Sequence, residues 1–158
     1  MQNIETILHP TDFSEPSANA FGFACTLARA LNARLLVLHV YPPPICHGEV
    51  VARRQPNGFH ELLWKELRAV LSPEPQVCVE HMLEEGDAAS EILRVARKVP
   101  CDLIVMGTHG RTGLGRLLMG SVAERVLRRA PCPVLAVKSC ATPPQRQPAE
   151  LQHTGANP

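Results

Sequence analysis

The segment from Gly107 to Ser121, GTHGRTGLGRLLMGS, concentrates residue types that bind anions. It contains five of the ten glycines of the chain, together with Arg111 and Arg116, and it has no acidic residue. Glycine lets backbone N–H groups approach a ligand closely, and arginine pairs with phosphate oxygens. We therefore predict that this segment cradles phosphate groups, with a contribution from the Ser121 hydroxyl.

Two common phosphate-binding motifs do not account for the segment. The chain contains no GxxxxGK[ST] loop. A dinucleotide fingerprint would follow the first strand, where residues 9–13 read HPTDF without a glycine. The observed spacing is G-x2-G-x9-G-[ST], and an ordinary flexible loop fits that spacing about as well. The flanking elements must therefore decide between the two interpretations.

Hydrophobic periodicity predicts the elements that position the segment. Apolar stretches of strand length alternate with amphipathic helical stretches, which favours a parallel sheet covered by helices on both faces. Residues 41–58 include three consecutive prolines and predict a loop. We expect strands over 3–9, 35–40, 76–83, 102–106 and 134–137, and helices over about 15–31, 59–71, 88–99 and 122–129.

Small polar residues mark the expected helix starts. Ser14, Asp87 and Ser121 are the predicted N-caps, and Pro16 suits a first helical turn. The fourth helix should direct three apolar side chains inward, namely Val122, Val126 and Leu127. In an open sheet of this kind, a ligand binds beyond the carboxyl ends of the strands, where the strand order reverses.

Composition limits the class of protein. The chain has 158 residues, of which 45% are hydrophobic and 20% charged, and this suits one compact domain. A net charge of +1 and 4% aromatic residues argue against nucleic-acid binding. No apolar run approaches the roughly 20 residues of a membrane span, and the charges of residues 1–12 do not suit a signal peptide. We expect a cytoplasmic protein without a membrane partner.

The six cysteines show no CxxC spacing and no finger-like array with histidine. We expect small buried apolar residues in a reducing compartment, with Cys25 on a helix and Cys78 in a strand. For Cys46, which stands beside His47, metal binding or oxidation is an alternative to a structural role.

Two longer stretches resemble the universal stress protein family. They are ILHPTDFSEPSANAF near the start and CDLIVMGTHGRTGLGRLLMGSVAERVLRRAPCPVLAVK near the end, and the resemblance covers roughly residues 4–138. In that family the glycine pattern marks the branch that binds ATP. The resemblance implies a domain over 1–139 with a Rossmann-type fold, similar to adenine nucleotide alpha hydrolases, and sheet order 3-2-1-4-5. The Pro- and Gln-rich residues 140–158 predict a disordered tail.

The resemblance also implies a set of ligand contacts. Asp12 and the backbone of Val40 would meet adenosine, and Met106 would lie near the ribose. ATP would carry Mg²⁺ or Mn²⁺ held through its phosphates and water, because few carboxylates are near. The full set of expected nucleotide-binding residues is Pro10, Thr11, Asp12, Val40, Met106, Gly107, His109, Gly110, Arg111, Gly120, Ser121 and Val122.

Several of these residues have a structural alternative. Asp12 could serve only to satisfy N–H groups of its own turn. His109 could be solvated on a loop rather than act as an acid or base. His39 and Trp64 are expected to have structural roles. Four arginines are expected to form a solvated helix face, and these are Arg116, Arg125, Arg128 and Arg129.

No set of nucleophile, base and orienting residue is apparent, so the sequence indicates no catalytic residue. We expect an ATP-binding regulatory protein of the stress response. The alternatives are a nucleotide-free dimeric adaptor of the same fold and a slow ATPase or autophosphorylating enzyme. An exposed last strand favours a homodimer, with Lys138 as an alternative edge blocker, and the pairing residues would be Val134, Leu135, Ala136 and Val137.

Overall fold

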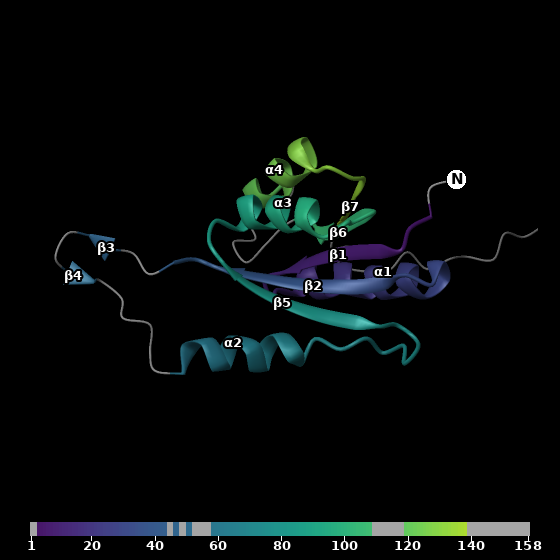
Figure 1. The fold of residues 1–158 in the computed structure, drawn as a ribbon, viewed down its shortest axis with the longest axis horizontal. Coiled ribbons are helices and arrows are strands. Elements are labelled where there is room, and N and C mark those ends of the chain that lie inside the picture. The colour runs from purple at the N-terminus through teal and green to yellow at the C-terminus, as the bar shows by residue number, and fades with distance from the viewer. Residues whose placement is uncertain (1–2, 44–45, 48–49, 52–57, 109–118, 139–158) are drawn as a thin grey trace, which may run out of the picture.

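A computed structural model describes residues 3–43, 46–47, 50–51, 58–108 and 119–138. Its centre is a five-stranded parallel sheet in the order β5-β2-β1-β6-β7 (Figure 1). Numbered along the chain within this sheet, the order is 3-2-1-4-5, which confirms the predicted fold class. The expected tail over 140–158 lies outside the described residues, as does Arg116. The strands are β1 (Thr6–Thr11), β2 (Arg34–Tyr41), β5 (Val79–Glu85), β6 (Leu103–Gly107) and β7 (Val134–Val137).

Helices cover both faces of this sheet (Figure 1). Successive side chains of a strand point to opposite faces, so Ile7 and Leu8 of β1 enter different cores. Ile7 belongs to the cluster that includes the α1 side chains, and Leu8 to the cluster formed with the third and fourth helices. The helices are α1 (Glu15–Leu31), α2 (Phe59–Arg68), α3 (Ala88–Lys98) and α4 (Ser121–Arg129).

Two of the three predicted N-caps are confirmed. The Ser14 side chain accepts a hydrogen bond from the Ser17 N–H, and the Asp87 side chain accepts one from the Ser90 N–H. The prediction for α4 was wrong, because the cap is Gly120 and Ser121 is the first helical residue. Gly120 has extended φ and ψ angles of −61° and 146°, and its carbonyl accepts the first helical bond from the Glu124 N–H at 2.9 Å.

Some predicted boundaries and faces also differ. Part of the expected 41–58 loop forms a short antiparallel pair, β3 (Cys46–His47) with β4 (Val50–Val51). The α2 helix ends at Arg68 instead of continuing to residue 71. Leu127 is 39% exposed rather than directed inward, because Ala123 and Val126 occupy the buried face of α4.

Cys25 is buried on α1 as expected, but Cys78 is exposed. The reason is the position of β5, which begins at Val79 rather than at residue 76. Cys78 therefore precedes the strand, and its side chain is not enclosed by the sheet and its helices.

The first strand continues through Pro10 to Thr11, beyond the predicted end at His9. Along β1, the backbone groups of successive residues point alternately to the two neighbouring strands. The Glu5 carbonyl faces β2 and the Thr6 carbonyl faces β6. Pro10 therefore faces β6, whose paired register with β1 covers only Ile7 and Leu8. Proline is tolerated here because it removes a donor on a side where the ladder is already ending.

The His9 side chain replaces the donor that Pro10 lacks. Its Nδ1 lies 2.9 Å from the Val105 carbonyl oxygen. Residues of β6 face β7 and β1 alternately, and since the Ile104 N–H bonds on the β7 side, the Val105 carbonyl points toward β1. A carbonyl only accepts, so Nδ1 carries the proton. His9 thus holds β1 and β6 together at the level where backbone pairing stops, just below the sheet edge on which the cavity opens.

Candidate functional site

A cavity of about 310 Å³ lies where the carboxyl ends of β1, β2 and β6 meet the first turns of α3 and α4. This is the position where the sheet order reverses, since β1 and β6 are neighbours in space but not in sequence. Its volume falls at the lower end of the range for small-molecule sites, about 300–1,000 Å³. The described lining residues are Pro10, Thr11, Asp12, Ser17, Leu38, Val40, Ala88, Ile92, Met106, Gly107, Thr108, Gly120, Ser121, Val122 and Ala123.

Every predicted site residue that the structure describes lines this cavity. Three others, His109, Gly110 and Arg111, lie outside the described residues, and the ligand-binding role of the whole set stays a prediction. Sequence reasoning missed several lining residues. Two could have been found from periodicity, because Leu38 shares a strand face with Val40 and Ile92 lies one helical turn after Ala88. The missed residues are Ser17, Leu38, Ala88, Ile92, Thr108 and Ala123.

Asp12 satisfies polar groups of its own turn and also lines the cavity. Its Oδ1 accepts hydrogen bonds from the Ser14 N–H at 3.1 Å and from the Ser14 hydroxyl at 2.5 Å. These bonds fix the carboxylate in the turn that starts α1, and the same residue lines the cavity. The adjacent Phe13 has a φ of 61°, a left-handed conformation that is unusual for a bulky residue. Its ring packs on the ring of His39, with 4.3 Å between the centroids.

The described ends of the glycine segment meet at one point. The Thr108 N–H donates to the Val137 carbonyl at 3.0 Å, so the chain remains paired with β7 just past β6. The Thr108 carbonyl then accepts from the Gly120 N–H at 2.8 Å. These two bonds bring Gly107 and Ser121 to the same wall of the cavity, although they are far apart in sequence.

The N-terminus of α4 opens onto the cavity through Gly120, Ser121 and Val122. The cap residue is a glycine, and no side-chain bond caps this terminus within the described part of the chain. The first N–H groups of a helix have no carbonyl partner within it, and they carry the positive end of the helix dipole. This wall therefore suits a negatively charged ligand group.

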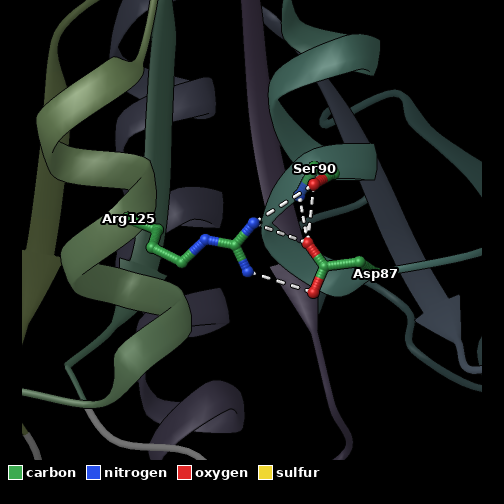
Figure 2. A network of polar contacts seen from close by, with 3 residues as sticks. All are labelled: Asp87, Ser90 and Arg125. Carbon is green, nitrogen blue, oxygen red and sulfur yellow. Dashed lines mark hydrogen bonds and ion pairs between the residues drawn. The ribbon is translucent and has the colours of Figure 1, made fainter.

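An ion pair fixes the α4 wall against α3, as Figure 2 shows. The Arg125 guanidinium donates to both carboxylate oxygens of Asp87, at 2.8 and 3.0 Å, and to the Ser90 hydroxyl at 3.2 Å. Hydrogen bonds from Arg125 and then from Ser90 hold the pKa of Asp87 well below its usual range. Arg125 was expected to be solvated, and it is exposed, but it also connects the two helices that contribute the neighbouring cavity residues Ala88 and Ser121.

Neither of the two histidines on the central strands is among the described lining residues. His39 is buried and its Nδ1 lies 2.8 Å from the Thr11 carbonyl, which supports the expected structural role. Burial lowers the pKa of His9 to about 4, against smaller opposite effects from the Val105 hydrogen bond and the Asp12 charge. His9 is therefore neutral at physiological pH.

The donor set of the cavity does not suit a metal site built by protein ligands alone. Asp12 is the one carboxylate among the described lining residues, and the described ranges contain no group of three His, Cys, Asp or Glu residues arranged for a metal ion. A divalent cation here would depend on oxygen ligands brought by the bound molecule and by water. In the same described ranges, no helix has the length and apolar character that crossing a membrane requires.

The chain belongs to the universal stress protein family, whose model matches residues 3–138. A universal stress protein of Methanocaldococcus jannaschii is 37% identical over 139 residues, covering 84% of this chain and 81% of that protein. Another, from Thermus aquaticus, is 35% identical over 142 residues, covering 85% of this chain and 98% of the relative. The resemblance noted in the sequence is thus confirmed.

Solved structures agree with the fold. Universal stress protein UspA from Lactobacillus plantarum superimposes with a TM-score of 0.71 at 23% identity, over 87% of this chain and 99% of its own. A universal stress protein in complex with cAMP gives a TM-score of 0.65 at 25% identity, over 87% and 98%. The universal stress protein from Archaeoglobus fulgidus in complex with dAMP gives 0.61 at 21% identity, over 86% and 98%.

Proposed function

We propose that this protein binds an adenine nucleotide, ATP in the first place, in the cavity at the ends of β1, β2 and β6. The observation that carries the proposal is the convergence of Asp12, Val40, Gly107 and Ser121 from four separate elements on one cavity. The family membership and the related structure with bound cAMP, at 25% identity, support an adenine-containing ligand.

In this proposal the adenosine half occupies the apolar side of the cavity. Leu38, Val40 and Ile92 supply apolar surface there, and Asp12 supplies a carboxylate held in place by Ser14. A carboxylate accepts hydrogen bonds from ribose hydroxyls, and the backbone N–H and C=O at a strand end can read an adenine edge. Neutral backbone groups would thereby orient the adenine base, and no charged side chain is needed beside it.

The phosphates face the N-terminus of α4 in this arrangement. Ser121 and Val122, the first residues of α4, offer backbone N–H groups, and Ser121 adds a hydroxyl. The helix dipole favours negative charge at this position. His109, Gly110 and Arg111 remain predicted phosphate contacts in the same segment. Mg²⁺ or Mn²⁺ would arrive with the nucleotide and would neutralise part of its phosphate charge.

The bound nucleotide would regulate assembly rather than serve as a substrate. Thr108 connects the two regions, because its carbonyl bonds to Gly120 at the phosphate wall and its N–H bonds to Val137 at the end of β7. The last strand is at the edge of the sheet, where a second copy of the chain could pair with it. We propose a nucleotide-responsive homodimer of the stress response, located in the cytoplasm, where it has access to ATP.

Replacing Gly120 with valine tests the site. The φ and ψ angles of Gly120 suit any residue, so the larger side chain acts by adding bulk at the cavity and not by straining the backbone. We expect titration calorimetry with Mg-ATP to show binding by the wild type and a loss of at least about tenfold in affinity, or 1.4 kcal/mol, in Gly120→Val. Parallel titrations with ADP, AMP and cAMP measure the contribution of the phosphates.

Gly22→Val is the matched control. Gly22 is exposed on α1, and a Cβ added there meets no atom within 4 Å. It should bind Mg-ATP like the wild type. Absence of heat from the wild type at millimolar nucleotide would contradict the proposal and favour the nucleotide-free adaptor. Equal binding by Gly120→Val would contradict the assignment of the phosphates to the α4 terminus.

A further inference from the structure

Two cysteines lie in contact at the end of the sheet opposite the cavity. The Sγ atoms of Cys101 and Cys132 are 3.7 Å apart, and both side chains are partly exposed. Cys101 lies between α3 and β6, and Cys132 lies between α4 and β7. The contact joins two connections of the fold that no sequence spacing would bring together.

The surrounding backbone fixes this contact. The Ile104 N–H donates to the Pro133 carbonyl at 3.0 Å, which aligns the starts of β6 and β7. The Cys101 thiol lies 3.4 Å from the Leu103 carbonyl, to which it donates. An S–S bond is about 2.05 Å long, so the two sulfur atoms, now 3.7 Å apart, must approach each other before the bond forms.

We propose that Cys101 and Cys132 form a reversible dithiol–disulfide site that is oxidised by hydrogen peroxide. This site goes beyond nucleotide binding and does not depend on it. The other two cysteines with described side chains lie elsewhere: Cys25 is buried in the core and Cys78 is exposed ahead of β5. No contact with a second sulfur atom is found for either of them within the described ranges. The side chains of Cys46 and Cys140 lie outside the described part of the chain.

The order of events follows from the two environments. Burial raises the pKa of the Cys101 thiol to about 12, and the neighbouring Cys132 adds to this rise. Burial also raises the pKa of Cys132, but a hydrogen bond from Cys101 opposes the effect, because the Cys101 thiol can turn from the Leu103 carbonyl toward the Cys132 thiolate. Cys132 is therefore the sulfur that reacts first with peroxide, and Cys101 is the sulfur that completes the disulfide.

The chemistry is balanced by one molecule of peroxide. The Cys132 thiolate attacks one peroxide oxygen, the O–O bond breaks, and the leaving hydroxide takes up a proton to become water. Cys132 is now a sulfenic acid. The Cys101 sulfur then attacks the Cys132 sulfur, the S–O bond breaks, and the second hydroxide leaves as water with the Cys101 proton. In total the two thiols lose two electrons to the peroxide, and a thiol reductant restores them.

Peptide mapping of the full chain tests this site directly. After treatment with hydrogen peroxide, free thiols are blocked with N-ethylmaleimide and the unreduced protein is digested with trypsin. Cleavage at Lys98, Arg111, Arg129 and Lys138 places Cys101 alone in peptide 99–111 and Cys132 alone in peptide 130–138. We expect these peptides as one linked species, lighter than their sum by two hydrogen atoms and separated again by dithiothreitol.

The variants identify the two roles. Cys78→Ser, which alters an exposed cysteine away from the pair, should give the linked species in wild-type yield. In Cys101→Ser, dimedone should trap the sulfenic acid of Cys132 in peptide 130–138. Recovery of both peptides as separate maleimide adducts, while Cys78 becomes oxidised, would overturn the proposal. Linkage found only between two chains, seen as a doubled mass under non-reducing conditions, would also overturn it.

Discussion

At the scale of single residues, the His9 side chain compensates for the N–H group that its neighbour Pro10 lacks. Pro10 cannot donate to β6, and the His9 side chain gives the Val105 carbonyl its hydrogen bond instead. The other ring nitrogen, Nε2, is buried and has no hydrogen-bond partner among the described residues. A buried imidazole in this position is tolerated only in its neutral form, since protonation would leave an unpaired charge in the core.

His9 should make the protein sensitive to mild acid. Its pKa is lowered from 6.5 to about 4 in the folded state, so the unfolded chain takes up a proton first as the pH falls between these values. Stability should therefore fall by about 3 kcal/mol over this window and should be independent of His9 above it. Urea unfolding at pH about 7 and about 4.5 measures the change.

The variant His9→Asn keeps a donor for Val105 and removes the titrating ring, so it should lose most of this pH dependence. His60→Asn, at an exposed position on α2, should keep it. An unchanged pH dependence in His9→Asn would show that other groups cause it. Asp87 does not mimic the effect, because its lowered pKa affects stability only at pH values below about 3.8.

At the scale of elements, the helix termini around the cavity are held by contacts between elements. Asp87 caps α3 through Ser90 and also binds Arg125 of α4 at both carboxylate oxygens (Figure 2). An exposed ion pair contributes little to global stability, but a bidentate pair constrains geometry. Its effect should appear in ligand affinity, because it sets the position of the α4 terminus.

Arg125→Met should weaken Mg-ATP binding severalfold while the thermal unfolding midpoint changes little. The substitution removes the link to α3 but leaves the Asp87 cap bonded to Ser90. Arg128→Met is the matched control, since Arg128 pairs with Glu124 within α4 itself. Calorimetry on both variants checks this expectation. Equal affinities would mean that the ion pair does not position the site, and Arg125→Lys should restore part of the lost affinity.

Local and non-local determinants explain which elements were predictable. The cap of α1 depends on Ser14 and its next few residues, and it was predicted correctly. The ends of β1 depend on pairing with β2 and β6, which are distant in the chain, and they were misplaced. The prediction of Ser121 as the α4 cap was also wrong: Gly120 is the cap, and its N–H bonds to Thr108, a residue at the other end of the glycine segment.

The candidate site divides in the same way. Gly107, Gly120 and Ser121 are conspicuous in sequence because glycine and serine cluster there. Leu38 and Ile92 resemble any other core residue, and only the sheet order places them at the cavity. The contact between Cys101 and Cys132 likewise depends on the register of β6 with β7, for which the sequence carries no local signal.

At the scale of the whole molecule, β7 is an edge strand, and none of the described strands pairs with its outer side. The Pro133 carbonyl accepts from Ile104 of β6, and the Val137 carbonyl accepts from Thr108 just past β6. Alternate residues of β7, including Ala136, therefore direct their backbone groups to the outer edge. Leu135 is partly exposed beside this edge. An antiparallel partner strand from a second copy would satisfy the outward groups and cover Leu135.

Ala136→Pro tests this interface. Proline removes a donor on the outer edge, where edge strands tolerate it, and leaves the bonds to β6 in place. We expect the wild type to sediment as a dimer and Ala136→Pro as a monomer of nearly unchanged thermal stability. Leu135→Pro, which removes a donor facing β6, should instead destabilise the fold. A dimer that persists in Ala136→Pro would place the interface elsewhere.

A crystal structure of the protein grown with Mg-ATP tests the central claim most directly. The account predicts electron density for an adenine nucleotide in the cavity, with the base beside Val40, the ribose near Asp12 and the phosphates at the N–H groups of Ser121 and Val122. Density for the nucleotide at another surface, or an empty cavity at saturating ATP, would contradict the account.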